Sequence, residues 1–191
     1  MIQHAASTSH IAIPTLTTPR FVMRPLRRTD AAALLPTLGE EAQCRYLSRP
    51  AFASQEELWN WLADPDWNGR TWIAEDADGT VVGRFVAVPD EPEGVEEIGY
   101  ITCAEWQGSG VARECSAALI AYLFDTEGAR RLVAEVDIEN LPSVRLLERL
   151  GFARTALHPA HEETHKGVCD IAFYALDRDR YRAERELDTH D

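Results

Sequence analysis

The pattern of apolar and polar positions is clearest between residues 95 and 127. Residues 95–103 include an apolar, β-branched run from Ile98 to Cys103, which predicts a buried strand. After Val111, apolar side chains recur at helical spacing, at Cys115, Ala118, Leu119, Tyr122 and Leu123. Gly128 is well placed to end that helix. Small residues separate the two elements, so this stretch predicts a strand, a tight turn and a helix.

Similar patterns predict the remaining elements. Apolar runs indicate strands over residues 21–26, 71–75, 80–88, 132–138, 152–157 and 168–176. Helical spacing predicts helices over residues 30–38 and 142–150, and a third helix that follows a capping box of Ser54 and Glu57 and is closed by Pro65 and Gly69. Asp78-Gly79 lies between two β-branched runs and predicts a hairpin. This order predicts an α/β (α+β) fold, with a mixed, mostly antiparallel central sheet of about seven strands and helices on both faces.

The length suits a single domain. We expect a flexible leader over residues 1–17, one domain over residues 18–182 and a charged tail over residues 183–191. Residues 177–191 are expected to fray, with one helical turn at most. Residues 158–167 are expected to form the connection between the last two strands.

Composition narrows the classes of partner. The 191 residues carry a formal net charge of −13, so nucleic acid is a poor partner, because binding it needs a basic surface. The acidic surface serves solubility, and it also suits a cationic substrate attracted by electrostatic steering. There is no apolar run of about 18 residues and no signal-peptide pattern, so we expect no membrane partner. The four cysteines form no CxxC pair, which favours a reducing, cytoplasmic setting.

The turn over residues 107–112 is the first candidate for chemistry. Its sequence, Gln-Gly-Ser-Gly-Val-Ala, brings two glycines and an alanine to the start of a helix. A small-residue turn there leaves several backbone N–H groups unpaired, and the positive end of the helix dipole adds to them. The sequence therefore predicts an anion site, suited to a cofactor that carries a diphosphate.

Two stretches resemble the GNAT (GCN5-related N-acetyltransferase) family. Residues 107–112 match its (Gln/Arg)-x-x-Gly-x-(Gly/Ala) signature, and residues 140–152 match its second signature, Asn-x-x-Ser followed by Leu-Gly-Phe. The interval between them suits one helix and one strand, as the family requires. Further stretches are similar to the Rim-type branch, the acetyltransferases of ribosomal-protein N-termini: residues 18–30, 97–100, 166–170 and 176–180, so that the likeness covers roughly residues 18–182.

The resemblance implies that two central strands splay apart and hold acetyl-CoA between them, with no metal. It implies that the diphosphate sits on the amides of the turn and that the pantetheine arm pairs with the strand backbone, where an N–H can polarise the thioester carbonyl. The implied cofactor-binding residues are Ile101, Thr102, Cys103, Gln107, Gly108, Ser109, Gly110, Val111, Ala112, Asn140 and Ser143. Many relatives are dimers, so a homodimer is one assembly to test.

A base must take a proton from the attacking amine, and a carboxylate on the central strand is the best candidate. Glu97 and Glu96 precede the turn and face opposite sides of the strand by alternation. Members of the family use a glutamate in this region, often through water. Glu97 is favoured over Glu96, each can instead be a solvated strand residue, and Asp137 and Glu135 are weaker candidates.

The group that protonates the leaving thiolate departs from the family pattern. Many members carry a tyrosine four residues after the position of Ser143, where this chain has Leu147. Ser143 is the alternative donor, or it satisfies the start of its helix. Asn140 is expected to order the cofactor or that helix start. Cys103 and Cys115 are expected to pack as small apolar residues, so we expect the amine to attack directly, without an acyl-cysteine.

Residues 161–165, His-Glu-Glu-Thr-His, match the HExxH pattern of zinc peptidases. That chemistry needs both histidines on one face of a helix, together with a third ligand. The segment here is too short and too polar for such a helix, so we discount a zinc site. We expect a loop that carries His158, His161 and His165 over the acceptor site, where they are solvated, contact substrate or respond to pH.

The sequence thus predicts an acetyl-CoA-dependent N-acetyltransferase of the Rim-type branch. Two acceptors compete: a protein or peptide N-terminus, and a small cationic amine such as an aminoglycoside, polyamine or amino-acid derivative. A non-catalytic acetyl-CoA-binding module is the alternative if Glu96 and Glu97 both point away from the cleft. The acceptor pocket is expected from residues 39–67 and 158–168. Four tryptophans are expected to pack in or beside the core, or in part to line a cleft: Trp59, Trp61, Trp67 and Trp72.

Overall fold

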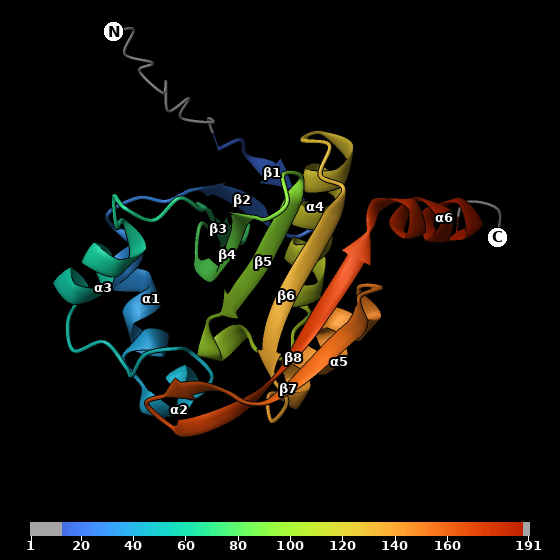
Figure 1. Cartoon of the computed structure of the whole chain (residues 1–191). Coiled ribbons are helices and arrows are strands. Elements are labelled where there is room, and N and C mark those ends of the chain that lie inside the picture. Colours follow the sequence, from blue (N-terminus) through green and yellow to red (C-terminus); the bar gives the residue numbers. More distant parts are fainter. Residues whose placement is uncertain (1–12, 189–191) are drawn as a thin grey trace, which may run out of the picture.

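The computed structural model describes residues 13–188 as one sheet with helices around it (Figure 1). The strands are β1 (Leu16–Thr17), β2 (Val22–Pro25), β3 (Arg70–Glu75), β4 (Val81–Asp90), β5 (Val95–Thr102), β6 (Arg131–Asp137), β7 (Ala153–Thr164) and β8 (Gly167–Asp177). The helices are α1 (Asp30–Leu38), α2 (Glu41–Cys44), α3 (Gln55–Leu62), α4 (Val111–Asp125), α5 (Leu141–Arg149) and α6 (Arg178–Asp188), with a 3₁₀ turn over Ala104–Trp106.

The strand order confirms the predicted fold class. Within the described part of the chain, eight strands lie in the order β1-β2-β3-β4-β5-β6-β8-β7. Neighbours are antiparallel except β5 and β6, which run parallel. The sheet is therefore mixed and mostly antiparallel. It has one strand more than expected, because β1 is too short to leave an apolar pattern.

Both faces of the sheet are apolar and covered. On one face, Trp72, Phe85 and Ile98 pack in a cluster with side chains of α4 and α5. On the other, Ile73 and Ile101 pack with side chains of α1 and α3. Figure 1 shows α1 and α3 at one side of the strands and α4 behind β5 and β6. A slip of one residue would exchange the faces, so burial on both sides fixes the register.

β5 and β6 separate part-way along their length. Their paired residues are Val95–Glu97 on β5 and Arg131–Val133 on β6. Beyond that point β5 pairs with β4 as far as Thr102, while β6 continues along β8. β5 then leads to the turn before α4, and β6 leads to α5. The splay that the resemblance implied is present, and it ends beside the starts of two helices.

The hairpin of β7 and β8 is longer than the sequence predicts. The expected loop over residues 158–167 is wrong, because β7 runs on to Thr164 beside β8. The register shifts between His158 and Glu162, and Ala160 adopts a φ of 50°, so a bulge absorbs the additional residues. β7 lies at the edge of the sheet, where Pro159 is tolerated because no further strand needs its missing N–H.

The first described residues contact the fold. Residues 1–12 of the predicted leader (residues 1–17) lie outside the described residues, and residues 13–17 lie within them. Leu16 and Thr17 pair with β2, and the indole of Trp72 donates a hydrogen bond to the Pro14 carbonyl (2.9 Å). The ordered domain therefore includes these residues.

The end of the chain is more regular than expected. Instead of a frayed segment after residue 177, α6 is a helix of 11 residues, and Tyr181 packs on Phe124 with 4.9 Å between ring centroids. Residues 189–191 lie outside the described part. Among the helices of residues 13–188, none is both long and apolar enough to cross a bilayer.

Candidate active site

The turn between β5 and α4 presents unpaired backbone amides. Gly108 and Gly110 adopt φ angles of 76° and 89°, which glycine reaches without strain. In residues 13–188, the amides of Gly108, Gly110, Val111 and Ala112 donate to no acceptor, and Glu114 is the first to bond back, to the Gly110 carbonyl (3.0 Å). Four free N–H groups at the positive end of α4 are the donors that an anion needs.

The polar side chains of the turn hold its shape. Gln107 Nε2 donates to Gln43 Oε1 (2.8 Å) and to the Thr102 carbonyl (3.3 Å). Ser109 Oγ donates to the Trp106 carbonyl (2.6 Å). Binding at this turn therefore falls to its backbone, and these two side chains act on it indirectly.

Arg20 lies beside the same turn, although no local pattern marked it as a residue of the site. Its Nη1 donates to the Ser109 carbonyl (3.1 Å), and its Nε pairs with Glu114 at 2.7 Å. Arg20 belongs to the connection between β1 and β2, far from the turn in sequence. It brings a positive charge close to the free amides.

The backbone of β5 alternates between its two sides. The Cys103 amide donates to the Val82 carbonyl of β4 (2.9 Å). In an antiparallel ladder the intervening residues turn their amides away, so Tyr100 and Thr102 present theirs to the gap before β6. Of the three strand residues expected to pair with pantetheine, Thr102 is the one with its amide toward the gap.

The start of α5 closes one wall of that gap. Asn140 Oδ1 accepts a hydrogen bond from the Ser143 amide (3.3 Å), so Asn140 caps the helix. Ser143 and Leu147 line a cavity of about 240 Å³ together with Tyr100. The Tyr100 hydroxyl donates to the Ser143 carbonyl (3.4 Å), and burial raises its pKa to about 12.

Tyr100 therefore places a phenol near Leu147, where the family's usual tyrosine is missing. Tyr100 was not among the predicted site residues, because it belongs to a different element from Leu147. Strand alternation could have found it, since Tyr100 lies on the same face of β5 as Ile98, which packs toward α4 and α5.

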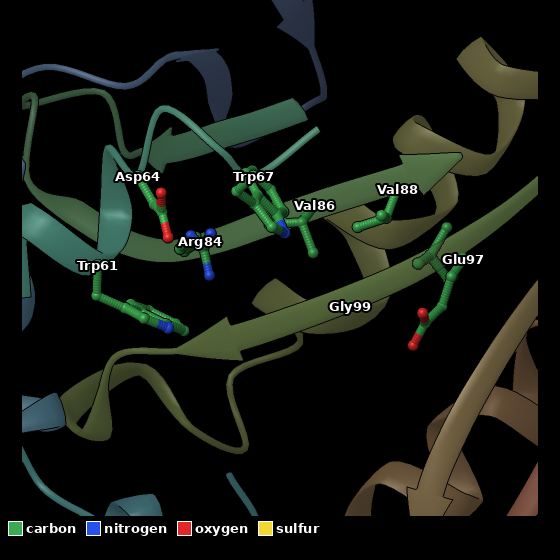
Figure 2. A pocket seen from close by; sticks show the side chains of 9 residues that line it. Trp61, Asp64, Trp67, Arg84, Val86, Val88, Glu97 and Gly99 are labelled. Carbon is green, nitrogen blue, oxygen red and sulfur yellow. The ribbon is translucent and has the colours of Figure 1, made fainter. Parts of the chain in front are cut away.

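A second cavity of about 300 Å³ opens on the α1 and α3 side of the sheet (Figure 2). It is lined by Trp61, Asp64, Trp67, Arg84, Val86, Val88, Glu97, Ile98 and Gly99. Five of these also line the first cavity: Trp61, Arg84, Val86, Ile98 and Gly99. The two cavities therefore adjoin along β4 and β5, and the first also reaches β6 and the start of α5, so there is space for two reactants.

Glu97 is the carboxylate of β5 that faces the second cavity. Burial raises its pKa, and the negative charges of Glu135 and Asp90 add to that shift. Among the ion pairs of the described chain, none involves Glu97. Glu135 lines the first cavity, and burial raises its pKa too, while His161 and His158 oppose that shift.

Glu96 faces the opposite layer. Its carboxylate pairs with Arg70 at 2.7 Å, and Arg70 also pairs with Glu127 after α4. Burial raises the pKa of Glu96, and Arg70 partly offsets that. Glu96 therefore contributes to a buried charge cluster and does not line either cavity.

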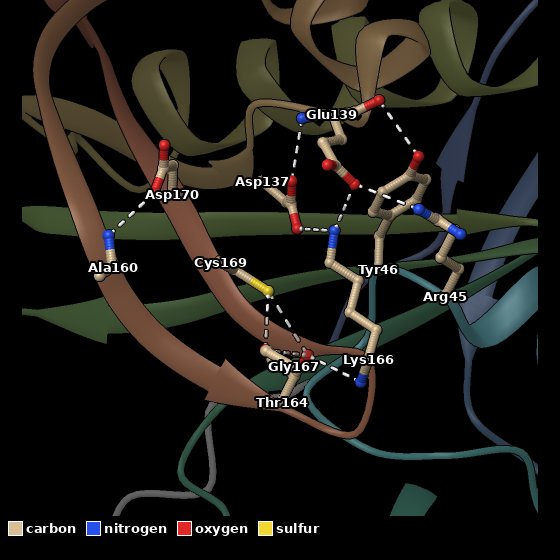
Figure 3. A network of polar contacts seen from close by, with 10 residues as sticks. All are labelled: Arg45, Tyr46, Asp137, Glu139, Ala160, Thr164, Lys166, Gly167, Cys169 and Asp170. Atoms are coloured by element: carbon tan, nitrogen blue, oxygen red, sulfur yellow. Dashed lines mark hydrogen bonds and ion pairs between the residues drawn. The ribbon is translucent and has the colours of Figure 1, made fainter.

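Asp137 and Glu139 belong to a network that ties the tip of the β7–β8 hairpin to the segment directly after α2 (Figure 3). Lys166 Nζ lies 2.6 Å from Asp137 and 2.8 Å from Glu139, and it sits 5.0 Å from the ring centroid of Tyr46. Arg45 also reaches Glu139, at 3.2 Å. Burial alone would raise the pKa of Asp137, but the hydrogen bonds from Lys166, the Glu139 amide and Cys169, with the charge of Lys166, together outweigh burial and lower the pKa. Asp137 is thus poorly suited to be a base.

The HExxH residues lie on an extended strand and the turn after it. Residues four apart on a strand are about 13 Å apart, too far to share a metal ion. His158 and His161 instead pack on Phe173, with ring centroids 4.8 and 5.3 Å away. Within residues 13–188, no group of three or more His, Cys, Asp and Glu side chains is arranged to hold a metal ion.

The tryptophans divide between core and cavity. Trp72 is fully buried, and Trp59 packs against the α1 and α3 cluster. Trp61 and Trp67 line the second cavity, where the guanidinium of Arg84 lies 4.6 and 5.3 Å from their ring centroids. The expectation of core packing is right for the first pair, and the alternative of a cleft is right for the second.

Splayed central strands and a turn with free backbone amides are features that the resemblance to the acetyltransferases implied. A family model described as the acetyltransferase (GNAT) domain matches residues 20–153. The chain therefore belongs to the GNAT family of N-acetyltransferases, as the resemblance implied.

Individual relatives agree with this family. The uncharacterized N-acetyltransferase p20 of Bacillus licheniformis is 25% identical over 174 residues, which is 87% of this chain and 98% of that protein. A mycothiol acetyltransferase of Salinispora tropica is 33% identical over 125 residues, 59% of this chain and 41% of that protein.

Solved structures share the fold at low sequence identity. An acetyltransferase of the GNAT family from Bacillus anthracis superposes with a TM-score of 0.80 at 20% identity, over 87% of this chain and 99% of that one. A spermidine N-acetyltransferase from Vibrio cholerae, in complex with CoA and spermine, superposes with a TM-score of 0.75 at 21% identity, over 85% and 98% of the two chains.

Proposed function

We propose that this enzyme transfers an acetyl group from acetyl-CoA to a primary amine by direct attack in a ternary complex, with Glu97 as the base. The observation that carries the proposal is the position of Glu97, a half-buried carboxylate without an ion-pair partner among the described residues, in a cavity that meets the cofactor gap. A non-catalytic binding module would need Glu96 and Glu97 both to face away from the cavities, and Glu97 faces one.

The residues present fit acetyl-CoA. The free amides of Gly108, Gly110, Val111 and Ala112 would hold the diphosphate, with Arg20 beside them. The Thr102 amide would pair with the pantetheine arm. Bound there, acetyl-CoA supplies the activated acetyl group, and the alignment of the two reactants accounts for much of the barrier reduction.

Glu97 would accept the proton that the acceptor's ammonium group loses, directly or through one water. The amine nitrogen then forms its bond to the carbonyl carbon as the carbon–sulfur bond breaks, and the further proton that the nitrogen must lose passes to the departing thiolate. A carboxylate whose pKa is raised toward neutral is a better proton acceptor than an ordinary glutamate.

Tyr100 is our candidate for the hydrogen bond to the departing sulfur, for which its hydroxyl would turn from the Ser143 carbonyl, and Ser143 is the alternative donor. Both line the cavity within the gap, and the phenol stays protonated at neutral pH because its pKa is about 12. Ser143 is nearer the capped start of α5, where its amide is already bonded to Asn140.

Finer assignments follow from the same residues. We propose the Rim-type branch because residues 18–30 contain β2 and the start of α1, and Arg24 pairs with Asp30 across them at 2.8 Å. We propose a cytoplasmic setting because the four cysteines are free and buried. A peptide N-terminus and a small amine are both candidate acceptors, and both are included in the experiment below.

The release of free thiol from acetyl-CoA, measured against a panel of amines and N-terminal peptides, tests the activity. We expect turnover with at least one class of amine. Clear acetyl-CoA binding without turnover on any acceptor would favour the binding module instead.

A further inference from the structure

Three arginines of the described chain are buried to the same degree: Arg24 (5% exposed), Arg70 (7%) and Arg84 (6%). Two of them have carboxylate partners: Arg24 pairs with Asp30 and Glu75, and Arg70 pairs with Glu96 and Glu127. Arg84 takes part in no ion pair of residues 13–188. A buried charge is costly unless it is paired, so the missing partner calls for an explanation.

The surroundings of Arg84 satisfy only part of its guanidinium. One nitrogen, Nη2, donates to Thr71 Oγ1 at 3.2 Å, while Nε is buried and has no hydrogen-bond partner. The indoles of Trp61 and Trp67 both line the cavity, and the cation lies over their ring faces. Burial lowers the pKa of Arg84 to about 10, so it is still a cation at neutral pH.

Arg84 also lines both cavities, so its unsatisfied side chain borders the space left for reactants (Figure 2). Asp64 lines the same cavity, but it forms no ion pair with Arg84 and instead accepts a hydrogen bond from the Asp66 amide (2.9 Å). Cavity geometry, burial and the missing carboxylate therefore point to a negative group brought by a ligand.

We propose that Arg84 binds a carboxylate of the acceptor, so that the amine acetylated here belongs to a small amino-acid-like molecule and not to a polyamine. This inference rests on the proposed acetyl transfer, because it names the substrate class of that same site. A cavity of about 300 Å³ suits a small molecule of this kind. A planar guanidinium donates to a carboxylate in a two-bond arrangement that a lysine cannot match.

The register of β4 and β5 gives the spacing of the two groups. Arg84 pairs with Ile101, Val86 with Gly99, and Val88 with Glu97. The backbone positions of Arg84 and Glu97 are thus four residues apart along the strands, about 13 Å, with Gly99 midway. An amine that reacts above Gly99 would lie about 7 Å along the strands from each position, within reach of both long side chains.

The experiment compares matched amines that differ by one carboxylate. The pairs are phenylalanine and phenethylamine, and lysine and 1,5-diaminopentane, with spermidine and O-phosphoethanolamine as further acceptors. With wild-type enzyme, we expect kcat/KM to favour the carboxylate member by about 10- to 100-fold, the usual size of one charged hydrogen-bonding interaction. This comparison needs no variant, so it does not depend on how any substitution folds.

Variants then assign the preference to Arg84. Arg84→Met should reduce kcat/KM for the carboxylate member about 10- to 100-fold and leave its partner amine little changed, and Arg84→Lys should keep part of the preference. Arg28→Met is the matched control, because Arg28 stacks on Trp59 at 5.2 Å but is exposed and lines neither cavity. It should leave the preference unchanged.

Four other results would each contradict a different part of the proposal. Equal or faster acetylation of the amines without a carboxylate, or of spermidine, overturns the role of Arg84 while acetyl transfer stands. Faster acetylation of O-phosphoethanolamine overturns the choice of carboxylate as the anion. An equal loss on both members of a pair in Arg84→Met identifies a structural role. The absence of turnover on any amine defeats the proposed function itself.

Discussion

Arg70 and Arg84 lie on neighbouring strands, have the same burial and face opposite sides of the sheet, yet their surroundings differ. Arg70 has two carboxylates around it, from β5 and from the end of α4. Arg84 has a threonine hydroxyl, two indole faces and a cavity. The glutamates of β5 divide in the same way, since Glu96 is paired and Glu97 is not.

This difference separates stabilising charges from charges available to a reaction. A paired, buried cluster has its charge compensated within the protein, so it has little left to offer a ligand. An unpaired carboxylate and an unpaired guanidinium in one cavity are compensated only when a substrate brings charges of its own. The adjacent residues Glu96 and Glu97 thus lie on opposite faces of the sheet, because successive side chains of a strand point to opposite faces.

Glu97→Gln tests the reactive side of this comparison most strongly. Glutamine keeps the shape and removes the proton acceptor, so kcat should fall by about 10²- to 10⁴-fold. The affinity for acetyl-CoA should not change, because the cofactor is held by the turn before α4. Thiol release and the Kd for acetyl-CoA measure the two quantities.

Glu96→Gln is the matched control, since it makes the same change one residue away on the paired side. Its kcat should fall by less than about tenfold, because Glu96 lines neither cavity. Equal losses in the two variants would contradict the division of the two glutamates between layers.

Arg70→Met tests the paired side through stability. Removing this arginine leaves Glu96 and Glu127, both partly buried, without their counter-charge, so the free energy of unfolding should fall by up to about 3 kcal/mol. Chemical denaturation measures it. Arg84→Met, which removes a charge that has no such partner, should cost no more than about 1 kcal/mol. Comparable losses at the two arginines would mean that Arg84 is also a structural residue.

The pH dependence of the reaction gives a smaller, graded effect. Glu97 works as a base only when ionised, and its pKa is raised by burial and by Glu135 and Asp90. kcat/KM should therefore rise with pH, up to about tenfold per unit, through a pKa above that of an ordinary glutamate. The rise should be absent in Glu97→Gln, and its persistence there would assign it to another group.

The same raised pKa has a consequence for stability. A carboxyl whose pKa is higher in the folded state favours folding at low pH, and this contribution is lost as the pH rises through that pKa. Glu97→Gln should therefore be at least as stable as the wild type at neutral pH, with the gap closing in acid. Thermal denaturation at several pH values checks the sign.

Much of the fold could be predicted from local patterns, because burial on both faces of the sheet requires apolar residues at regular spacing along the strands and helices. The turn over residues 107–112 and the capped start of α5 were also readable, since glycines, an N-cap and a proline act on neighbouring residues. β7 was misread because an edge strand buries little and shows no alternation: its backbone is extended by pairing with β8, which no local pattern records.

The site residues that the sequence missed depend on contacts between distant elements. Arg20 is recruited by Glu114, Tyr100 by the start of α5, and Arg84 by two tryptophans of α3 and the loop after it. Each stands in an ordinary strand or connection. Their roles depend on partners that lie far away in the sequence, or on the absence of such a partner. These contacts are visible only in the folded structure.

Tyr100→Phe should give the smallest effect. Tyr100 lies on the same face of β5 as the paired Glu96, so this variant tests whether that face also contributes to the reaction. Removing the Tyr100 hydroxyl keeps the ring in place but would delete the hydrogen bond that we propose to the developing thiolate, so kcat should fall by up to about tenfold. Ser143→Ala should fall less, because the Ser143 carbonyl, and not its hydroxyl, accepts from Tyr100. Single-turnover rates separate this step from product release. A larger loss in Ser143→Ala would make the serine the donor, and it would confine the reactive groups of β5 to the face that holds Glu97.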